Sequence, residues 1–232
     1  MRIAKEIEII DLALYLPKQK ILIISDLHIG YEEVLNKQGM LVPRFQFKEI
    51  CQRLMNILKK TKPDVVVING DLKHEFGTIS EQEWRETLKV LDLIHKYCKK
   101  IVLIKGNHDT ILGLIAKKRK IEIVEDYKID KILILHGHKL VKTNAETLII
   151  GHEHPAISLR RGIRQEKFKC FLKGKYKRKN LIVMPSFCLV TEGTDIQKEE
   201  LLSPYLQQNL NDFDVYVVAD KIYEFGKIRG LK

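Results

Sequence analysis

Five apolar segments of the chain are each followed, directly or after one glycine, by an aspartate, an asparagine or a histidine. The polar motifs that follow them occupy residues 26–28, 70–71, 106–109, 136–138 and 151–154. In an α/β sheet the carboxyl ends of neighbouring strands meet at a crevice, and ligands bind there. The sequence therefore predicts a fold that gathers these motifs at one edge.

Short β-branched segments alternate with amphipathic ones in the first half of the chain, and this alternation is typical of an α/β fold. Strands are expected at 7–16, 21–25, 64–69, 101–105, 132–135, 147–150, 181–184 and 214–219. Apolar stripes of helical period predict helices over 47–58 and 84–98, and 109–118 is a shorter candidate. The second half is rich in strands, so we expect a single domain, 1–232, with two packed sheets.

Histidines are concentrated in the polar motifs. The chain has eight histidines, and six of them stand in these five places. A lone histidine is more often a satisfied core group than a ligand, but random scatter would not produce this distribution. Imidazoles with a few carboxylates suit a divalent transition metal, because calcium takes more oxygen ligands and structural zinc favours thiolates. The motifs offer too many ligands for one open site, and they fit two metals that share a carboxylate.

A pair of divalent ions has a defined chemistry. Two ions about 4 Å apart bridge a hydroxide and hold phosphate oxygens for in-line attack. Two dications outweigh two carboxylates, so the site stays electropositive and its expected substrate is an anion, above all a phosphate ester. Manganese is the first candidate for the metal, with zinc, iron, nickel or cobalt as alternatives.

Basic residues are concentrated in one stretch. The chain has 41 Lys and Arg against 30 Asp and Glu, and residues 156–180 alone hold ten basic residues and one acid. This local excess, with interleaved aromatic residues, favours a nucleic-acid contact, and a solvated lysine-rich hairpin is the alternative. Gly162 and Gly174 permit the turns of a hairpin beside the metal crevice. The candidate nucleic-acid-binding residues are Arg160, Arg161, Lys173, Lys175, Lys177 and Arg178.

The cysteines and the apolar pattern indicate the cellular location that the protein is expected to have. The four cysteines lie far apart without a Cys-x-x-Cys pair, which is typical of reduced thiols in a cytosolic protein. No apolar run exceeds five residues, and charges interrupt the start of the chain where a signal peptide is apolar. We expect a cytoplasmic protein without membrane contact. Its expected partners are a phosphoester substrate, with DNA or RNA as candidates, and a second copy in a candidate homodimer.

In this order the motifs resemble the signature of the calcineurin-like metallophosphoesterases, which is Asp-x-His, Gly-Asp, Gly-Asn-His-Asp/Glu, His-Gly and Gly-His-x-His. The chain has every element of it, over about residues 20–190. The resemblance implies a four-layer α/β/β/α sandwich of two mixed sheets, and a phosphoesterase with two metal ions. The ligands it implies are Asp26, His28 and His154 for the first ion, Asn107, His136 and His152 for the second, and Asp71 for both.

The resemblance also implies catalytic roles. His108 faces the scissile phosphate as an acid or electrostatic stabiliser, and Asp109 orients its ring. Residues 70–74 are most similar to SbcD-type DNA-repair nucleases and their shorter archaeal relatives. In those nucleases a histidine three positions after the bridging aspartate positions the substrate phosphate, and His74 stands at that place. The chain departs from them because only about 40 residues follow its last core strand, where they continue into a capping domain.

Three functions stay open at this point. The first is phosphodiester hydrolysis in nucleic acid by a nuclease-like enzyme. The second is a phosphoesterase for small molecules, such as cyclic nucleotides or phosphomonoesters. The third is a non-catalytic scaffold, since the superfamily includes a retromer subunit that kept the fold but lost key active-site residues. The scaffold is the least favoured, because His108 and all seven ligand positions are present.

Overall fold

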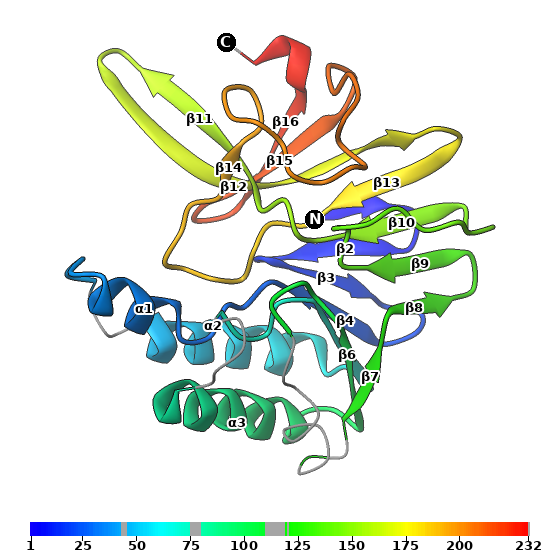
Figure 1. Ribbon diagram of the computed structural model, residues 1–232. Helices are drawn as coiled ribbons and strands as arrows, with labels where there is room; N and C mark the ends of the chain where they lie inside the picture. The colour runs from blue at the N-terminus through cyan, green and yellow to red at the C-terminus, as the bar shows by residue number, and fades with distance from the viewer. Residues whose placement is uncertain (43–45, 75–79, 110–118, 120, 232) are drawn as a thin grey trace.

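The computed structural model describes residues 1–42, 46–74, 80–109, 119 and 121–231, with the backbone alone for Arg161. The candidate helix at 109–118 lies outside the described residues, apart from Asp109. Two mixed sheets stack face to face, and the α-helices of the described residues lie on the side of the first sheet (Figure 1). The expected α/β class with two mixed sheets is confirmed.

The first sheet has seven strands that follow one another in chain order. They are β1 (Arg2–Ala4), β2 (Ile7–Ile10), β3 (Ala13–Leu16), β4 (Ile21–Ser25), β5 (Val65–Asn69), β6 (Lys100–Ile104) and β7 (Glu122–Val124). β1 to β4 pair antiparallel, whereas β4 to β7 run parallel. The single strand expected at 7–16 is two strands, because the chain turns at Asp11, which has a φ of 57°.

Three α-helices of the described residues accompany the parallel strands. α1 (Tyr31–Lys37) and α2 (Gln46–Thr61) lie between β4 and β5, and α3 (Glu81–His95) lies between β5 and β6. The apolar stripes predicted from the sequence face the sheet, where Leu54 and Leu91 are completely buried. Among the described residues, no helix combines the length and the apolar character needed to cross a membrane.

The second sheet has nine strands. They are β8 (Asp126–Ile129), β9 (Ile132–Leu135), β10 (Thr147–Ile150), β11 (Pro155–Arg161), β12 (Arg164–Tyr176), β13 (Lys179–Val183), β14 (Thr194–Asp195), β15 (Asp214–Val218) and β16 (Ile222–Lys227). β9, β10 and β13 run parallel. The long strand β12 pairs first with β11 and then with β13 and β15, so it extends well beyond the other strands.

Apolar side chains fill two layers of the molecule. The layer between the sheets contains residues from both, among them Ile23 of the first sheet and Ile149 of the second. The outer face of the second sheet buries Leu148 against Tyr205. Here the structure differs from the expected outer helical layer, because the covering segment 196–213 consists of turns and coil.

The basic stretch forms two hairpins. Its turns lie at Gly162, with a φ of 62°, and at Lys177, with a φ of 54°. Gly174 was expected at a turn but lies inside β12, where the ring of Phe213 occupies the space that a Cβ atom would need. A glycine is required there because a side chain would push this ring off the sheet.

Candidate metal centre

The polar motifs converge because of the way the strands pair. β4, β5 and β6 are parallel neighbours in the first sheet, and β9 and β10 are parallel neighbours in the second. The loops that follow these five strands meet at one edge of the stacked sheets. This edge brings together all seven residues that the motifs nominate as ligands, which are Asp26, His28, Asp71, Asn107, His136, His152 and His154.

Asp26, His28 and His154 form a first group, in which one nitrogen or oxygen atom of each lies within 4.8 Å of the others. The Nε2 atoms of the two histidines are 3.3 Å apart, and His154 Nε2 is 3.6 Å from Asp26 Oδ1. Asp26 is completely buried, and its Oδ1 accepts no hydrogen bond from the described residues. A buried carboxylate oxygen is costly unless a positive charge faces it, so this group fits a metal ion.

Asp71, His136 and His152 form a second group by the same measure. His136 Nε2 is 3.4 Å from Asp71 Oδ2 and 2.9 Å from the side-chain oxygen of Asn107. The same Oδ2 atom of Asp71 is 3.9 Å from His28 Nε2 in the first group. One carboxylate oxygen therefore faces both groups, which is the geometry that a shared ligand requires.

The backbone of the ligand loops is strained. Asp26, His28, Asp71, His152 and His154 have φ values between 34° and 66°, in the left-handed region that residues other than glycine rarely adopt. Each such residue costs about 1–3 kcal/mol, which the surrounding packing must offset. Strain of this kind gathers at functional sites, and here it falls on five of the seven nominated ligands.

Two motif glycines are explained by the side chains that lie against them. A Cβ atom on Gly70 would collide with the ring of His136, and one on Gly106 would collide with the carboxylate of Asp71. A larger residue at either place would displace a nominated ligand. The glycines of the Gly-Asp and Gly-Asn-His motifs are therefore part of the ligand geometry as well as of the turns.

The buried charges of the centre influence one another. Burial opposes the protonation of His136, but the carboxylates of Asp26 and Asp71 outweigh it and raise the pKa of His136 to about 9. Burial and the neighbouring His154 lower the pKa of His28 to about 3, and burial with His136 lowers the pKa of His152 to about 4. Neutral histidines beside ionised carboxylates are the protonation states that bind metals. A dication would take the place of the proton on His136.

The catalytic candidates His108 and His74 lie beside the first group. Their ring centroids are 5.2 Å and 5.3 Å from that of His28. The backbone carbonyl of His74 accepts a hydrogen bond of 2.6 Å from His108 Nδ1. Because a carbonyl can only accept, this bond orients the ring of His108 and places a proton on its Nδ1 atom.

Asp109 differs from its expected role. Its two oxygens accept hydrogen bonds from the backbone N–H groups of Leu72 (3.1 Å) and Gly106 (3.0 Å). Burial and the nearby Asp71 raise the pKa of the Asp109 carboxyl to about 7. Asp109 therefore ties the loop after β5 to the loop after β6, and the carbonyl of His74 takes over the orientation of the His108 ring.

The basic candidates are divided between the two ends of β12. Arg160 is exposed near the tip of the β11–β12 hairpin, which starts directly after His154 and projects from the body (Figure 1). The side chain of Arg161 lies outside the described residues. Lys175 pairs with Asn180, which in turn is level with Thr147 at the start of β10, the end of that strand remote from His152.

The single basic ribbon expected beside the metals is therefore wrong for one part of the stretch. β12 has 13 residues, about 40 Å at 3.3 Å per residue, so its two ends cannot both lie near the centre. The residues at the end remote from the centre are Lys175, Lys177 and Arg178, whereas Lys173 is level with Ile149, further along β10 toward His152.

Two residues beside the centre were not predicted from the sequence. Ser25 Oγ donates a hydrogen bond of 2.6 Å to Asp26 Oδ2, which also accepts one from the backbone N–H of His152 (3.1 Å). The ring of Tyr31 stacks on that of His74. Ser25 directly precedes the Asp-x-His motif in the chain, whereas Tyr31 follows it by three positions.

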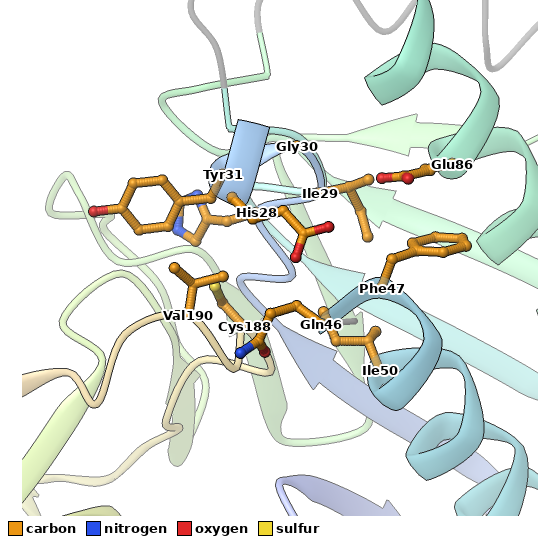
Figure 2. Close-up of a pocket in the computed structure, with 11 residues that line it drawn as sticks. His28, Ile29, Gly30, Tyr31, Gln46, Phe47, Ile50, Glu86, Cys188 and Val190 are labelled. Carbon is orange, nitrogen blue, oxygen red and sulfur yellow. The ribbon is translucent and has the colours of Figure 1, made fainter. Parts of the chain in front are cut away.

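A small pocket lies next to the centre, behind His28 (Figure 2). Apolar side chains from α2, such as Phe47 and Ile50, line it together with Cys188 and Val190. Its volume of about 10 Å³ corresponds to about one water molecule. This pocket is therefore part of the packing behind the centre and cannot receive a phosphoester.

Two stacked mixed sheets with aspartates and histidines at one edge define a metallophosphoesterase fold. The family model described as "Calcineurin-like phosphoesterase" matches residues 19–220, and the chain belongs to this family. The crystal structure of Pseudomonas putida nuclease MPE is similar over 93% of this chain and 92% of that chain, at 21% identity and a TM-score of 0.68.

Further comparisons are weaker. YfcE, a phosphoesterase from E. coli, is similar over 90% of this chain and 97% of that chain, at 15% identity and a TM-score of 0.45. A search of curated protein sequences returned no match. At these identities the solved structures bear on the fold alone, and the likeness to SbcD-type nucleases stays a prediction.

Proposed function

We propose that the chain is a two-metal phosphodiesterase that cleaves nucleic acid. The observation that carries this proposal is that Asp71 Oδ2 faces the Nε2 atom of His28 in the first group and the Nε2 atom of His136 in the second. Two divalent ions, with manganese as the first candidate, would polarise the phosphate and supply a hydroxide nucleophile. The residues that would hold them are Asp26, His28 and His154 on one side, Asn107, His136 and His152 on the other, and Asp71 between them.

His108 and His74 are proposed to act on the substrate. Both side chains are half-buried, so they are accessible at the surface of the centre. The bond from His108 Nδ1 to the carbonyl of His74 keeps the His108 ring in one orientation. A proton or positive charge aimed at the leaving oxygen contributes about 10²–10⁴-fold in rate. His108 is proposed to supply it, and His74 is proposed to position the phosphate.

The β11–β12 hairpin, hereafter the arm, supports nucleic acid as the substrate. It rises from the metal edge, and Arg160 and Arg164 near its tip are exposed. These arginines would hold the phosphate backbone while another phosphate reaches the centre. The resemblance of residues 70–74 to SbcD-type repair nucleases favours the same substrate class, and the fold is also that of a bacterial nuclease.

A small-molecule phosphoesterase is the second candidate. The observation that favours it is the position of Lys175 and its basic neighbours at the end of β12 remote from the centre. If the arm, like the remote end of β12, contacts only solvent, then no part of the basic stretch contributes to a nucleic-acid contact.

A hydrolysis screen with added manganese distinguishes these functions. The substrates are bis-p-nitrophenyl phosphate, p-nitrophenyl phosphate, cyclic nucleotides, and DNA and RNA oligomers. The proposal expects cleavage of the chromogenic diester and of at least one oligomer. Hydrolysis of cyclic nucleotides or of the monoester alone would favour the second candidate. No hydrolysis with manganese, zinc, iron, nickel or cobalt would contradict both.

A further inference from the structure

We infer that Tyr31 is a positioning residue that holds the imidazole of His74 in place for the substrate phosphate. The inference rests on the proposed function and adds a residue outside the five polar motifs. The ring centroids of Tyr31 and His74 are 3.8 Å apart with an interplanar angle of 20°. In Figure 2 the Tyr31 side chain lies beside His28, and the hydroxyl group of Tyr31 points away from the other labelled residues. The ring, and not the hydroxyl, is thus the part that meets the histidines.

The rings around His74 are arranged in a definite way. His108 lies nearly parallel to His74, at 29° and a centroid distance of 5.4 Å, whereas His28 meets it edge-on at 66° and 5.3 Å. His74 Nδ1 is 3.4 Å from His28 Nδ1, which is long for a hydrogen bond. Among the described residues, the closest ring contact of His74 is therefore the one with Tyr31.

The local chain geometry places Tyr31 at this point. Gly30 has a φ of 92°, and the N–H of Tyr31 donates a hydrogen bond of 3.2 Å to the carbonyl of His28. This turn brings a side chain three positions after His28 back over the metal edge. A Cβ atom on Gly30 would come within 2.9 Å of Glu83, whose Oε1 accepts a hydrogen bond of 3.0 Å from the N–H of His74. Glu83 therefore bonds the backbone of His74, and its side chain packs closely against Gly30, the residue before Tyr31.

The backbone of His74 is held more firmly than its side chain. Its N–H also lies 3.1 Å from the carbonyl of Ile29, and its own carbonyl accepts the bond from His108 Nδ1. A fixed backbone still leaves an imidazole free to rotate about its side-chain bonds. A flat ring stacked at 3.8 Å restricts that rotation, and small errors in the position of a group that meets the substrate have large effects on rate.

The test is a double-mutant cycle between Tyr31 and His74 in the full-length protein, with bis-p-nitrophenyl phosphate and added manganese. Tyr31→Ala is expected to lower kcat by about 10- to 100-fold, with KM and metal content close to wild type. The same change in a His74→Ala background is expected to have less than about a twofold effect, because the residue through which it acts is gone. Tyr31→Phe keeps the ring and is expected to restore kcat to within about threefold of wild type.

The matched control is Tyr223→Ala, which removes another half-buried tyrosine, on β16, with a hydroxyl bonded to Asp220. It is expected to leave kcat unchanged. Equal losses from Tyr31→Ala in both backgrounds, or a rise in KM alone, overturn the inference, because the ring would then contact the substrate directly. A Tyr31→Phe variant as slow as Tyr31→Ala overturns it too, since the hydroxyl would then be responsible.

A second measurement does not depend on activity. Histidine NMR signals, assigned with a His74→Gln variant, are expected to broaden or shift for His74 in Tyr31→Ala and to stay close to wild type in Tyr31→Phe. An unchanged His74 signal in Tyr31→Ala overturns the inference. A wild-type protein that hydrolyses no phosphoester contradicts the proposed function instead, and the NMR result then decides the contact on its own. Should Tyr31→Ala fail to fold, Tyr31→Leu, which has similar bulk but no flat ring, takes its place.

Discussion

The two sheets contribute different chemistry to the metal centre. The loops after the first sheet supply every proposed oxygen ligand and one imidazole, which are Asp26, Asp71, Asn107 and His28. The loops after the second sheet supply imidazoles alone, which are His136, His152 and His154. Each of the two ligand groups combines a carboxylate from the first sheet with at least one histidine from the second. Neither sheet therefore carries either of these two groups alone, and both exist only because the sheets are docked; His28, His74 and His108, whose ring nitrogens also lie within 4.8 Å of one another, all follow strands of the first sheet.

This division has an electrostatic consequence. The carboxylates of the first sheet lie within 3.4 Å of the His136 ring, and His136 is the histidine whose pKa is raised. A cation at this place, either a proton or a metal ion, links the two sheets. A metal ion that binds only when the two sheets are docked should therefore stabilise the folded state, because any ligand that binds the native state alone does so.

The largest expected effect comes from removing the shared carboxylate of the first sheet. Asp71→Asn removes the negative charge that faces both groups and replaces one of the two carboxylate oxygens with an NH2 group, which cannot bind a metal ion, so we expect loss of all phosphoester hydrolysis and fewer than two bound metals per chain. Activity is measured with bis-p-nitrophenyl phosphate, and metal content by elemental analysis after gel filtration. Near-normal turnover in this variant would show that Asp71 is not a shared ligand.

A smaller loss is expected from a residue of the first sheet that is not a proposed ligand. His108→Ala should lower turnover by about 10²–10⁴-fold, because it removes charge or a proton at the transition state. Metal content should stay at the wild-type value. His95→Ala is the matched control, because the imidazole of His95 contacts the carbonyl of Arg119, away from the centre. If metal content falls with activity in His108→Ala, His108 is itself a ligand.

The next prediction compares the two basic ends of the second sheet. Arg160→Ser with Arg164→Ser removes two charges from the arm, and Lys175→Ser with Lys177→Ser removes two charges from the remote end. The arm variant should weaken DNA or RNA binding and flatten the log–log dependence on salt by about 0.7–0.9 per lost contact. Fluorescence anisotropy at several salt concentrations, with EDTA to prevent cleavage, measures both.

The remote-end variant serves as the control with equal charge, and it should bind as the wild type does. Hydrolysis of the small chromogenic diester should change little in either variant. Equal losses of affinity in the two variants would mean that net charge alone attracts the nucleic acid. No binding by the wild type at about 50 mM salt would favour the small-molecule phosphoesterase.

The smallest effect concerns the ionic link between the sheets in metal-free protein. The folded state raises the pKa of His136 from 6.5 to about 9, so its protonation stabilises the fold fully below pH 6.5. This contribution is lost as the pH rises through 9. Urea midpoints with EDTA should therefore fall between pH 6.5 and 9.5 more steeply in the wild type than in His136→Gln. Identical pH profiles for the two proteins would refute the link.

The sequence alone determined the strands that carry the centre and the residues at their ends. The strands could be predicted because their periodicity is a local property of the sequence. The position of the polar residues could be predicted because neighbouring parallel strands bring their carboxyl ends to one edge of the sheet. Gly70 and Gly106 could be recognised as motif residues in the same way. The alternation of the first half likewise predicted α2 and α3, whose apolar stripes are set by helical spacing.

Contacts between distant segments were decided by the tertiary structure. Asp109 was expected to orient His108, but the docking of two loops turns its oxygens to backbone N–H groups and presents the carbonyl of His74 instead. Tyr31 gives no signal by itself, because its stack on His74 depends on where the loops after β4 and β5 meet.

The basic stretch shows the same limit on a larger scale. Its charge could be counted in the sequence. The number of basic residues does not reveal, however, which end of a strand lies toward the metal centre. Only the pairing of β12 with β11 at one end and β13 at the other reveals that Arg160 lies on the metal side and Lys175 on the opposite side. The physical reason is that residue spacing fixes distance along one strand, whereas the register between strands is set by packing across the whole sheet.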